Sequence, residues 1–144
     1  MKKLLPLLLL LSCQAKPNQS LADHTKDEAV IRQTLADQVT AWNQGDIEKF
    51  MQGYWQSDSI LFIGSKIAHG WDSTLVRYKR SYPDRAAMGK LNFDILRIDF
   101  ISANSYLVTG KYFLKREKDN PSGIFTLLFQ KKNGVWVIVY DHTS

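Results

Sequence analysis

The residues most able to do chemistry stand together at the end of the chain, where Asp141, His142, Thr143 and Ser144 follow an apolar run over residues 134–140. The run is rich in β-branched and aromatic residues, which favours a strand. Because the ordinary pKa of histidine is about 6.5, His142 is the candidate catalytic acid or base. A strand that pairs centrally would carry this polar tip to the mouth or floor of whatever the sheet encloses.

Alternation along the strand decides which of these side chains can meet. Successive residues point to opposite faces of a sheet, so Asp141 and Thr143 are expected on one face, and His142 and Ser144 on the other. The second face is also expected to carry Trp136, Ile138 and Tyr140. A Ser-His-Asp relay between neighbours is therefore not expected. His142 keeps two alternative roles, contact with a ligand or a hydrogen bond to backbone that closes the end of the fold.

Aromatic side chains with polar tips can form the walls of a pocket for an apolar molecule that carries a few polar groups. Asp58 directly precedes an apolar run, so it is either a pocket carboxylate or a turn residue. The predicted ligand-binding residues are Tyr54, Trp55, Asp58, Trp71, Tyr78, Tyr112, His142 and Ser144. Basic residues near the end of the third predicted helix, among them Arg77, could also attract an acidic ligand to the pocket rim.

Several kinds of site are not expected. The three histidines, His24, His69 and His142, are scattered, and the sequence has one cysteine and no His-Glu-x-x-His motif, so no metal site is predicted. Residues 64–70 have the wrong order for a phosphate-binding loop, and no cofactor is predicted. The formal net charge is +5, and it falls to about +3 if residues 1–12, with Lys2 and Lys3, are removed, which is too small an excess to favour nucleic acid as a partner.

The first residues have the pattern of a secretion signal. Basic residues precede an apolar run over residues 4–11, which is too short to cross a bilayer because a spanning helix needs about 20 residues. The end of the run, Leu-Leu-Ser-Cys at residues 10–13, resembles a bacterial lipobox. The resemblance implies cleavage before Cys13 and a lipid on its sulfur; the alternative is an ordinary signal peptide cut after Ala15.

The predicted organisation is a signal peptide over residues 1–12, a polar tether over 13–22 and one domain over 23–144. Gln14 follows the cysteine, which in the lipoprotein pattern of two-membrane bacteria implies passage to the outer membrane. We therefore expect a lipoprotein of the bacterial cell envelope whose domain faces the periplasm and which contacts the membrane only through its lipid.

Three helices are predicted before the long strands. An apolar stripe at helical spacing over residues 31–42 predicts the first helix, and Gly45 is expected to end it in a left-handed conformation. Asp46 is expected to cap a second, short helix. A third helix is predicted to end near Tyr82, because a proline follows directly.

One strand is predicted over residues 59–64, and four long antiparallel strands complete the chain. The alternation of apolar residues changes phase at Ile95 and Leu96, which predicts a β-bulge there. Asn133 and Gly134 form a strong hairpin-turn signal. Helices followed by strands indicate an α+β fold, and a strongly bent antiparallel sheet wrapped on three helices would form a cone with an apolar interior.

Five segments carry a family resemblance. They are Trp42-Asn43-Gln44-Gly45-Asp46, residues 54–64, Gly70-Trp71-Asp72, residues 123–128 and the closing Trp136-x-Ile138-Val139-x-Asp141-His142-Thr143-Ser144. Together they resemble the nuclear transport factor 2-like superfamily, in particular its SnoaL-like branch of small bacterial proteins, and they are similar to the association domain of calcium/calmodulin-dependent kinase. The resemblance covers residues 23–144. It implies a cone-shaped, cystatin-like barrel, a pocket at its wide end and dimerisation through the outer face of the sheet.

The superfamily includes the ketosteroid isomerases, whose mechanism uses a proton-shuttling aspartate and a tyrosine in the oxyanion hole. Laid on this sequence, the tyrosine position falls on Gln38 and the aspartate position on Phe62 or Ile63. None of these side chains transfers protons, so a steroid-isomerase mechanism is not supported.

The sequence favours a domain that binds a small organic ligand. One alternative is a SnoaL-like enzyme, an isomerase, cyclase or hydrolase, with His142 as acid or base; another is a dimeric assembly module with a vestigial pocket. A proton-transfer group inside the cavity would separate the first two readings. Apolar residues on both faces of the segments 106–114 and 124–130 exceed what the helices can cover, so a homodimer through the outer sheet face is also expected.

Overall fold

The computed structural model describes residues 21–144, and α1 (Leu21–Gln44) begins just before the domain boundary expected at Asp23. The predicted signal peptide, the lipid on Cys13 and residues 13–20 of the tether lie outside the described residues, so they stay predictions. Within the described part of the chain, each helix is too short or too polar to cross a membrane.

The helices and two short strands come first along the chain, and the long strands come last. In order, the elements are α1 (Leu21–Gln44), α2 (Ile47–Met51), β1 (Leu61–Ile63), β2 (Ile67–His69), α3 (Trp71–Ser81), α4 (Arg85–Met88), β3 (Lys90–Ser102), β4 (Ser105–Lys115), β5 (Ser122–Lys132) and β6 (Val135–Thr143). The predicted α+β class is confirmed. The prediction of three helices omitted α4, a single turn capped by Asp84, because 4 residues are too few to show an apolar period.

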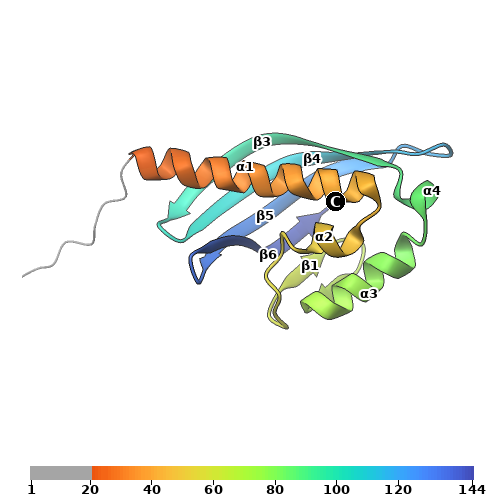
Figure 1. The fold of residues 1–144 in the computed structure, drawn as a ribbon, viewed down its shortest axis with the longest axis horizontal. Helices are drawn as coiled ribbons and strands as arrows, with labels where there is room; N and C mark the ends of the chain where they lie inside the picture. The colour runs from red at the N-terminus through yellow and green to blue at the C-terminus, as the bar shows by residue number, and fades with distance from the viewer. Residues whose placement is uncertain (1–20) are drawn as a thin grey trace, which may run out of the picture.

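The six strands of residues 21–144 form one sheet in the order β2-β1-β6-β5-β4-β3 (Figure 1). Neighbouring strands are antiparallel except β1 and β6, which run parallel. The sheet is therefore mixed and not purely antiparallel as predicted, since the long connection between β1 and β6 leaves their relative direction free. The last strand lies between β1 and β5, so it pairs centrally.

A β-bulge bends β3 where the sequence predicts it. Ile95 and Arg97 pair with successive residues of β4, which leaves Leu96 as an extra residue. Leu96 is exposed, while Ile98 returns to the face that packs against the core. The change of phase in the sequence therefore reflects one extra residue in β3. This extra residue keeps the apolar side chains before and after the bulge on the same face of the sheet.

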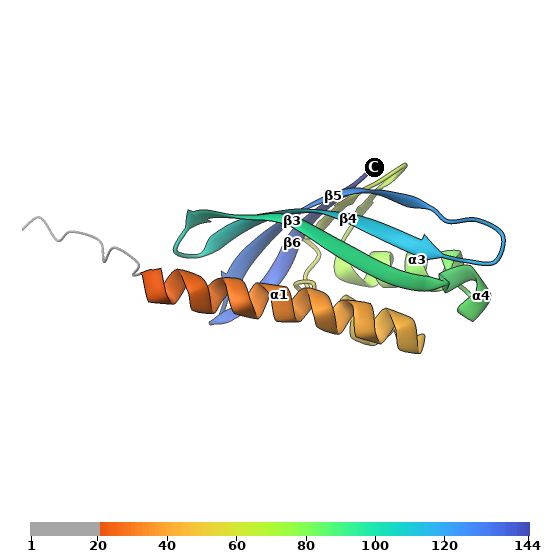
Figure 2. The same cartoon turned by 90° about the horizontal axis from the view of Figure 1, so that it is seen from above.

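The long helix covers one face of the sheet. Figure 2 shows α1 along one side of the long strands, with no helix on the opposite side. The face of α1 toward the sheet carries Ile31, Leu35 and Trp42, all of them buried. Gly45 ends α1 with a φ of +85°, a left-handed conformation that glycine adopts without strain, and Asp46 caps α2 at once. Both predictions for this turn are confirmed.

The N-terminal half of α1 is pinned to the sheet by a buried carboxylate. Asp27 Oδ1 accepts hydrogen bonds from Trp136 Nε1 at 2.8 Å and from Lys131 Nζ at 3.1 Å. Asp27 and Trp136 are both buried. One side chain of α1 is thereby joined to both β5 and β6, away from solvent.

We expect Asp27→Ala to lower the free energy of unfolding by about 1–3 kcal/mol, because the buried indole N–H of Trp136 loses its acceptor. Urea denaturation followed by tryptophan fluorescence measures the change. Asp37→Ala is the matched control, since Asp37 is exposed on the same helix, and it should change the free energy by less than about 0.5 kcal/mol. Equal losses in the two variants would contradict the role given to Asp27.

Candidate functional site

A second β-bulge, in β6, decides which side chains enter the interior of the fold. Ile138 and Tyr140 pair with successive residues of β5, so Val139 is an extra residue. The alternation of the strand changes phase there. Asp141 is consequently buried, at 6% exposed, while His142 is exposed.

This bulge corrects the predicted division of β6 into two faces. Simple alternation places Trp136 and Ile138 on the side of His142. In the structure both are buried and share the inner face with Asp141, because the extra residue intervenes. The carboxylate therefore lies inside the fold, and the imidazole lies on the other face.

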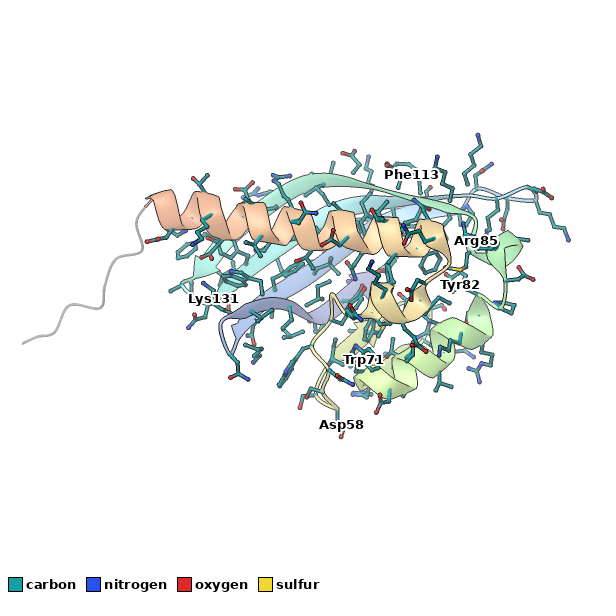
Figure 3. The ribbon with its side chains drawn as sticks, in the orientation of Figure 1. Asp58, Trp71, Tyr82, Arg85, Phe113 and Lys131 are labelled. Atoms are coloured by element: carbon teal, nitrogen blue, oxygen red, sulfur yellow. The ribbon has the colours of Figure 1, made fainter. Side chains whose placement is uncertain are left out.

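A cavity of about 190 Å³ lies between the inner face of the sheet and the helices, and we call it the inner cavity. Its walls are largely aromatic and include Trp42, Phe50, Tyr54, Tyr78, Tyr82 and Phe125. Figure 3 shows Tyr82, which follows the last residue of α3. Gln38, Arg116, Asp141 and Thr143 add polar groups to this wall.

Of the described residues that line the inner cavity, Asp141 is the one carboxylate. Its Oδ2 accepts a hydrogen bond from the Tyr54 hydroxyl at 2.7 Å, and its Oδ1 accepts one from the Thr143 hydroxyl at 2.8 Å. Burial raises the pKa of Asp141, and the two hydrogen bonds offset part of the rise. An ionised carboxylate can accept about four hydrogen bonds, so acceptor sites remain for a ligand.

The segment after α2 holds Tyr54 in place beside the bulge. The amide of Trp55 donates to the carbonyl of Ile138 at 2.9 Å, and the amide of Ile138 donates to the carbonyl of Gly53 at 3.0 Å. Tyr54 itself forms a parallel bridge with Ile138 and is buried. Its hydroxyl thereby reaches the carboxylate of Asp141, three residues after Ile138 on β6.

Two further tyrosines bring hydroxyls to the cavity wall. Burial raises the pKa of Tyr78 and Tyr82, and the charge of Asp141 raises the pKa of Tyr78 further. Burial and Asp141 likewise raise the pKa of Tyr54. All three phenols therefore keep their protons at neutral pH. Gln38 completes the polar wall, and its Nε2 donates to a backbone carbonyl of α2 at 3.1 Å.

A wider cavity of about 610 Å³ lies next to the inner one, between α3 and the ends of β1 and β6. We call it the outer cavity. The two cavities share five lining residues, Tyr78, Tyr82, Tyr112, Asp141 and Thr143. His142 and Ser144 line the outer cavity and are exposed.

The structure brings part of the predicted ligand-binding set together. Tyr54, Tyr78 and Tyr112 line the inner cavity, and His142 and Ser144 line the outer one. The candidate catalytic residue His142 therefore stands at the outer cavity, whose wall also includes Asp141, and does not line the inner cavity.

Three predicted ligand-binding residues, Trp55, Asp58 and Trp71, line neither cavity. The Trp55 ring lies under Lys132 Nζ, 4.5 Å from its centroid. Trp71 Nε1 donates to the carbonyl of Met51 at 2.9 Å, so this side chain ties α3 to α2. Asp58 is exposed, and Figure 3 shows it at the margin of the molecule, far from Tyr82. These three residues therefore do not belong to the walls of the two cavities, and their contact with a ligand stays a prediction.

The positions aligned with the steroid-isomerase motif have other roles. Gln38 lines the inner cavity, Phe62 is buried with its ring centroid 4.7 Å from that of Tyr54, and Ile63 lines the outer cavity. The ionisable carboxyl group in the wall of the inner cavity is Asp141, which is among the residues able to do chemistry but not in the predicted ligand-binding set. The apolar residues of β6 do not predict the bulge at Val139 that directs Asp141 inward.

No metal centre is formed by the residues that the structure describes, since no three His, Cys, Asp or Glu side chains among residues 21–144 are grouped to hold an ion. The inner cavity instead combines aromatic walls, one carboxylate and several neutral hydroxyls. Such a wall can pack against the apolar part of a ligand, accept a hydrogen bond from one of its polar groups and donate hydrogen bonds to another.

The chain matches the family model of the SnoaL-like domain over residues 31–144. No protein with a curated description matches it. A solved structure with 44% sequence identity is an NTF-2 like protein of unknown function from Shewanella oneidensis MR-1, with a TM-score of 0.80 over 82% of this chain and 98% of that one.

Two more distant structures share the fold alone. Hexachlorocyclohexane dehydrochlorinase LinA-type3 from Novosphingobium barchaimii LL02 is 16% identical, with a TM-score of 0.72 over 87% of this chain and 90% of that one. A protein named for the association domain of calcium/calmodulin-dependent protein kinase type II, from Thiobacillus denitrificans ATCC 25259, is 14% identical, with a TM-score of 0.66 over 77% and 90%. The predicted nuclear transport factor 2-like, or cystatin-like, fold is confirmed. With a family match over most of its length, the chain belongs to the SnoaL-like domain family.

Proposed function

We propose that this chain binds a small molecule with an apolar, ring-sized body and a hydrogen-bond donor that faces Asp141. The observation that carries the proposal is a carboxylate only 6% exposed in a cavity walled mainly by aromatic rings. A buried charge is costly unless it is paired, and Asp141 accepts hydrogen bonds from two neutral hydroxyls and forms no ion pair with a described side chain. A donor on a ligand would add the partner that the carboxylate lacks.

The volume of the inner cavity limits the size of the ligand. The cavity measures about 190 Å³, and an engineered protein cavity of about 150 Å³ holds a benzene molecule. There is therefore room for one six-membered ring with a small substituent. A phenol combines a ring for the aromatic walls with an O–H group for the carboxylate, so it is a suitable probe.

Acid–base catalysis at the same site is the second candidate, and the raised pKa of Asp141 favours it. A carboxylate with a raised pKa can take a proton from a substrate and retain it closer to neutral pH than an ordinary one. Tyr54 and Tyr78 would donate hydrogen bonds to negative charge that develops on the substrate. One structure of this fold is named a dehydrochlorinase, although the likeness extends to the fold alone. His142 is less suited to this role, because it is exposed on the opposite face of β6.

We further propose a homodimer through the sheet face that the helices leave uncovered. Phe113 and Ile124 are 43% and 49% exposed, large fractions for apolar side chains. Leu107, Leu128 and Tyr140 form a row across β4, β5 and β6 on the same face. An assembly module with an unused pocket is the third candidate, and it would form this dimer without binding a ligand.

The binding proposal is tested with 4-ethylphenol as the probe in isothermal titration calorimetry at neutral pH. The wild type should bind it, and Asp141→Asn should weaken binding by about tenfold or more, because a hydrogen bond to a charged group is worth about 1.5–3 kcal/mol. Asp58→Asn removes the same charge outside both cavities and should leave the affinity unchanged. Absence of binding to the wild type, or equal affinities in wild type and Asp141→Asn, would contradict the proposal.

Affinity for 4-ethylphenol should also depend on pH. Since the pKa of Asp141 is raised, the carboxylate takes up a proton as the pH falls through a range above about 3.9, and it then accepts hydrogen bonds less strongly. The wild-type affinity should decline over that range, and Asp141→Asn should show no such decline. A wild-type affinity that increases as the pH falls would be the opposite of this expectation.

Static light scattering at micromolar concentration should give a dimer mass for the wild type. Replacing both Phe113 and Ile124 by glutamate should give a monomer with an unchanged circular dichroism spectrum, because both side chains are exposed. Val76→Glu, at a position 65% exposed on α3, is the control and should remain dimeric. A monomeric wild type would refute the proposed dimer.

A further inference from the structure

Arg77 brings a positive charge into the outer cavity. It lies on α3, is half-buried, and its Nη1 donates to the carbonyl of Lys66 at 3.2 Å. No carboxylate among residues 21–144 forms an ion pair with it. Arg116, which lines the inner cavity, is by contrast paired with Asp119 at 2.7 Å. The guanidinium of the outer cavity is therefore the one that can still pair with an anion from a ligand.

The guanidinium stands close to the end of β6. A side-chain carbon built on Gly64 would lie 4.0 Å from Arg77 Nη2 and 3.7 Å from the carbonyl oxygen of Thr143. Burial is the main influence on the pKa of Tyr78 and Tyr82 and raises both, while the charge of Arg77 acts in the opposite direction on each. The charge of Arg77 therefore acts on the tyrosines that line both cavities.

The two cavities are neighbours that share part of their walls. Tyr78, Tyr82 and Tyr112 line both cavities, and each of them is only half-buried. A molecule with its ring in the inner cavity could extend a short chain past these tyrosines. The end of that chain would lie in the outer cavity, where Ser65 and Ser81 add hydroxyl groups to the wall that holds Arg77.

We propose that the ligand is a monocarboxylic acid, with its ring in the inner cavity and its carboxylate paired with Arg77 in the outer cavity. The inference rests on the proposed small-molecule-binding function and names the chemical class of the ligand. A guanidinium presents parallel N–H groups that match the two oxygens of a carboxylate. A phosphate would bring nearly two negative charges toward Asp141 against one arginine, so the cavity favours an acid with a single charge.

The test compares 3-(4-hydroxyphenyl)propanoate with 3-(4-hydroxyphenyl)propanamide by isothermal titration calorimetry on the full chain. The two probes have the same ring and chain length, and they differ in charge. The wild type should bind the carboxylate about tenfold more tightly than the amide. Arg77→Gln should abolish this preference and leave the affinity for the amide within about twofold of wild type. Arg80→Gln removes an equal charge from an exposed position on the same helix and should keep the preference.

Binding of 4-ethylphenol, which has no acidic group, separates this inference from the function on which it rests. If 4-ethylphenol binds the wild type but the carboxylate has no advantage over the amide, the monocarboxylate inference is wrong and the binding function stands. The inference is equally wrong if the preference survives in Arg77→Gln or disappears in Arg80→Gln. If none of the three probes binds the wild type, both the inference and the proposed function are contradicted.

Discussion

The burial of one carboxylate is the constraint on which the rest of the site depends. Burial raises the pKa of Asp141, so the folded chain holds a proton there more tightly than the unfolded chain does. The ligand-free fold therefore loses stability as the pH rises from the ordinary aspartate pKa through the raised one. Hydrogen bonds from Tyr54 and Thr143 offset part of this cost. Groups that cost stability and face a cavity are common at binding and catalytic sites, and this supports the proposed function.

The surrounding elements hold that carboxylate in a fixed position. The extra residue Val139 turns the end of β6 inward, and the parallel neighbour β1 and the antiparallel neighbour β5 fix its backbone on both sides. At the chain end, a Cβ on Gly123 would lie 1.8 Å from the carbonyl oxygen of Ser144, so a glycine is required where β6 closes on β5. The site is thus built on paired strands, which hold its geometry better than loops do.

The sequence predicted those features whose cause is local. The left-handed end of α1 at Gly45 can be predicted because a glycine precedes a capping residue. The bulge at Leu96 can be predicted because the alternation of apolar residues changes phase there. The bulge at Val139 was not readable, because every residue from 135 to 140 is apolar or aromatic and no change of phase shows. Tertiary packing decides which residue is extra. For that reason the sequence alone favours His142 over Asp141, and it gives no sign that β1 runs parallel to β6.

The central claim is that Asp141 is a buried acceptor available to a ligand, and its ionisation can be observed directly. The measurement is a pH titration of the aspartate side-chain carboxyl carbons by nuclear magnetic resonance, with the Asp141 signal assigned by its absence in Asp141→Asn. We expect a titration midpoint above the ordinary value of about 3.9, and a lower midpoint when saturating 4-ethylphenol donates to the ionised form. A midpoint at or below the ordinary value, unchanged by the phenol, would contradict the account.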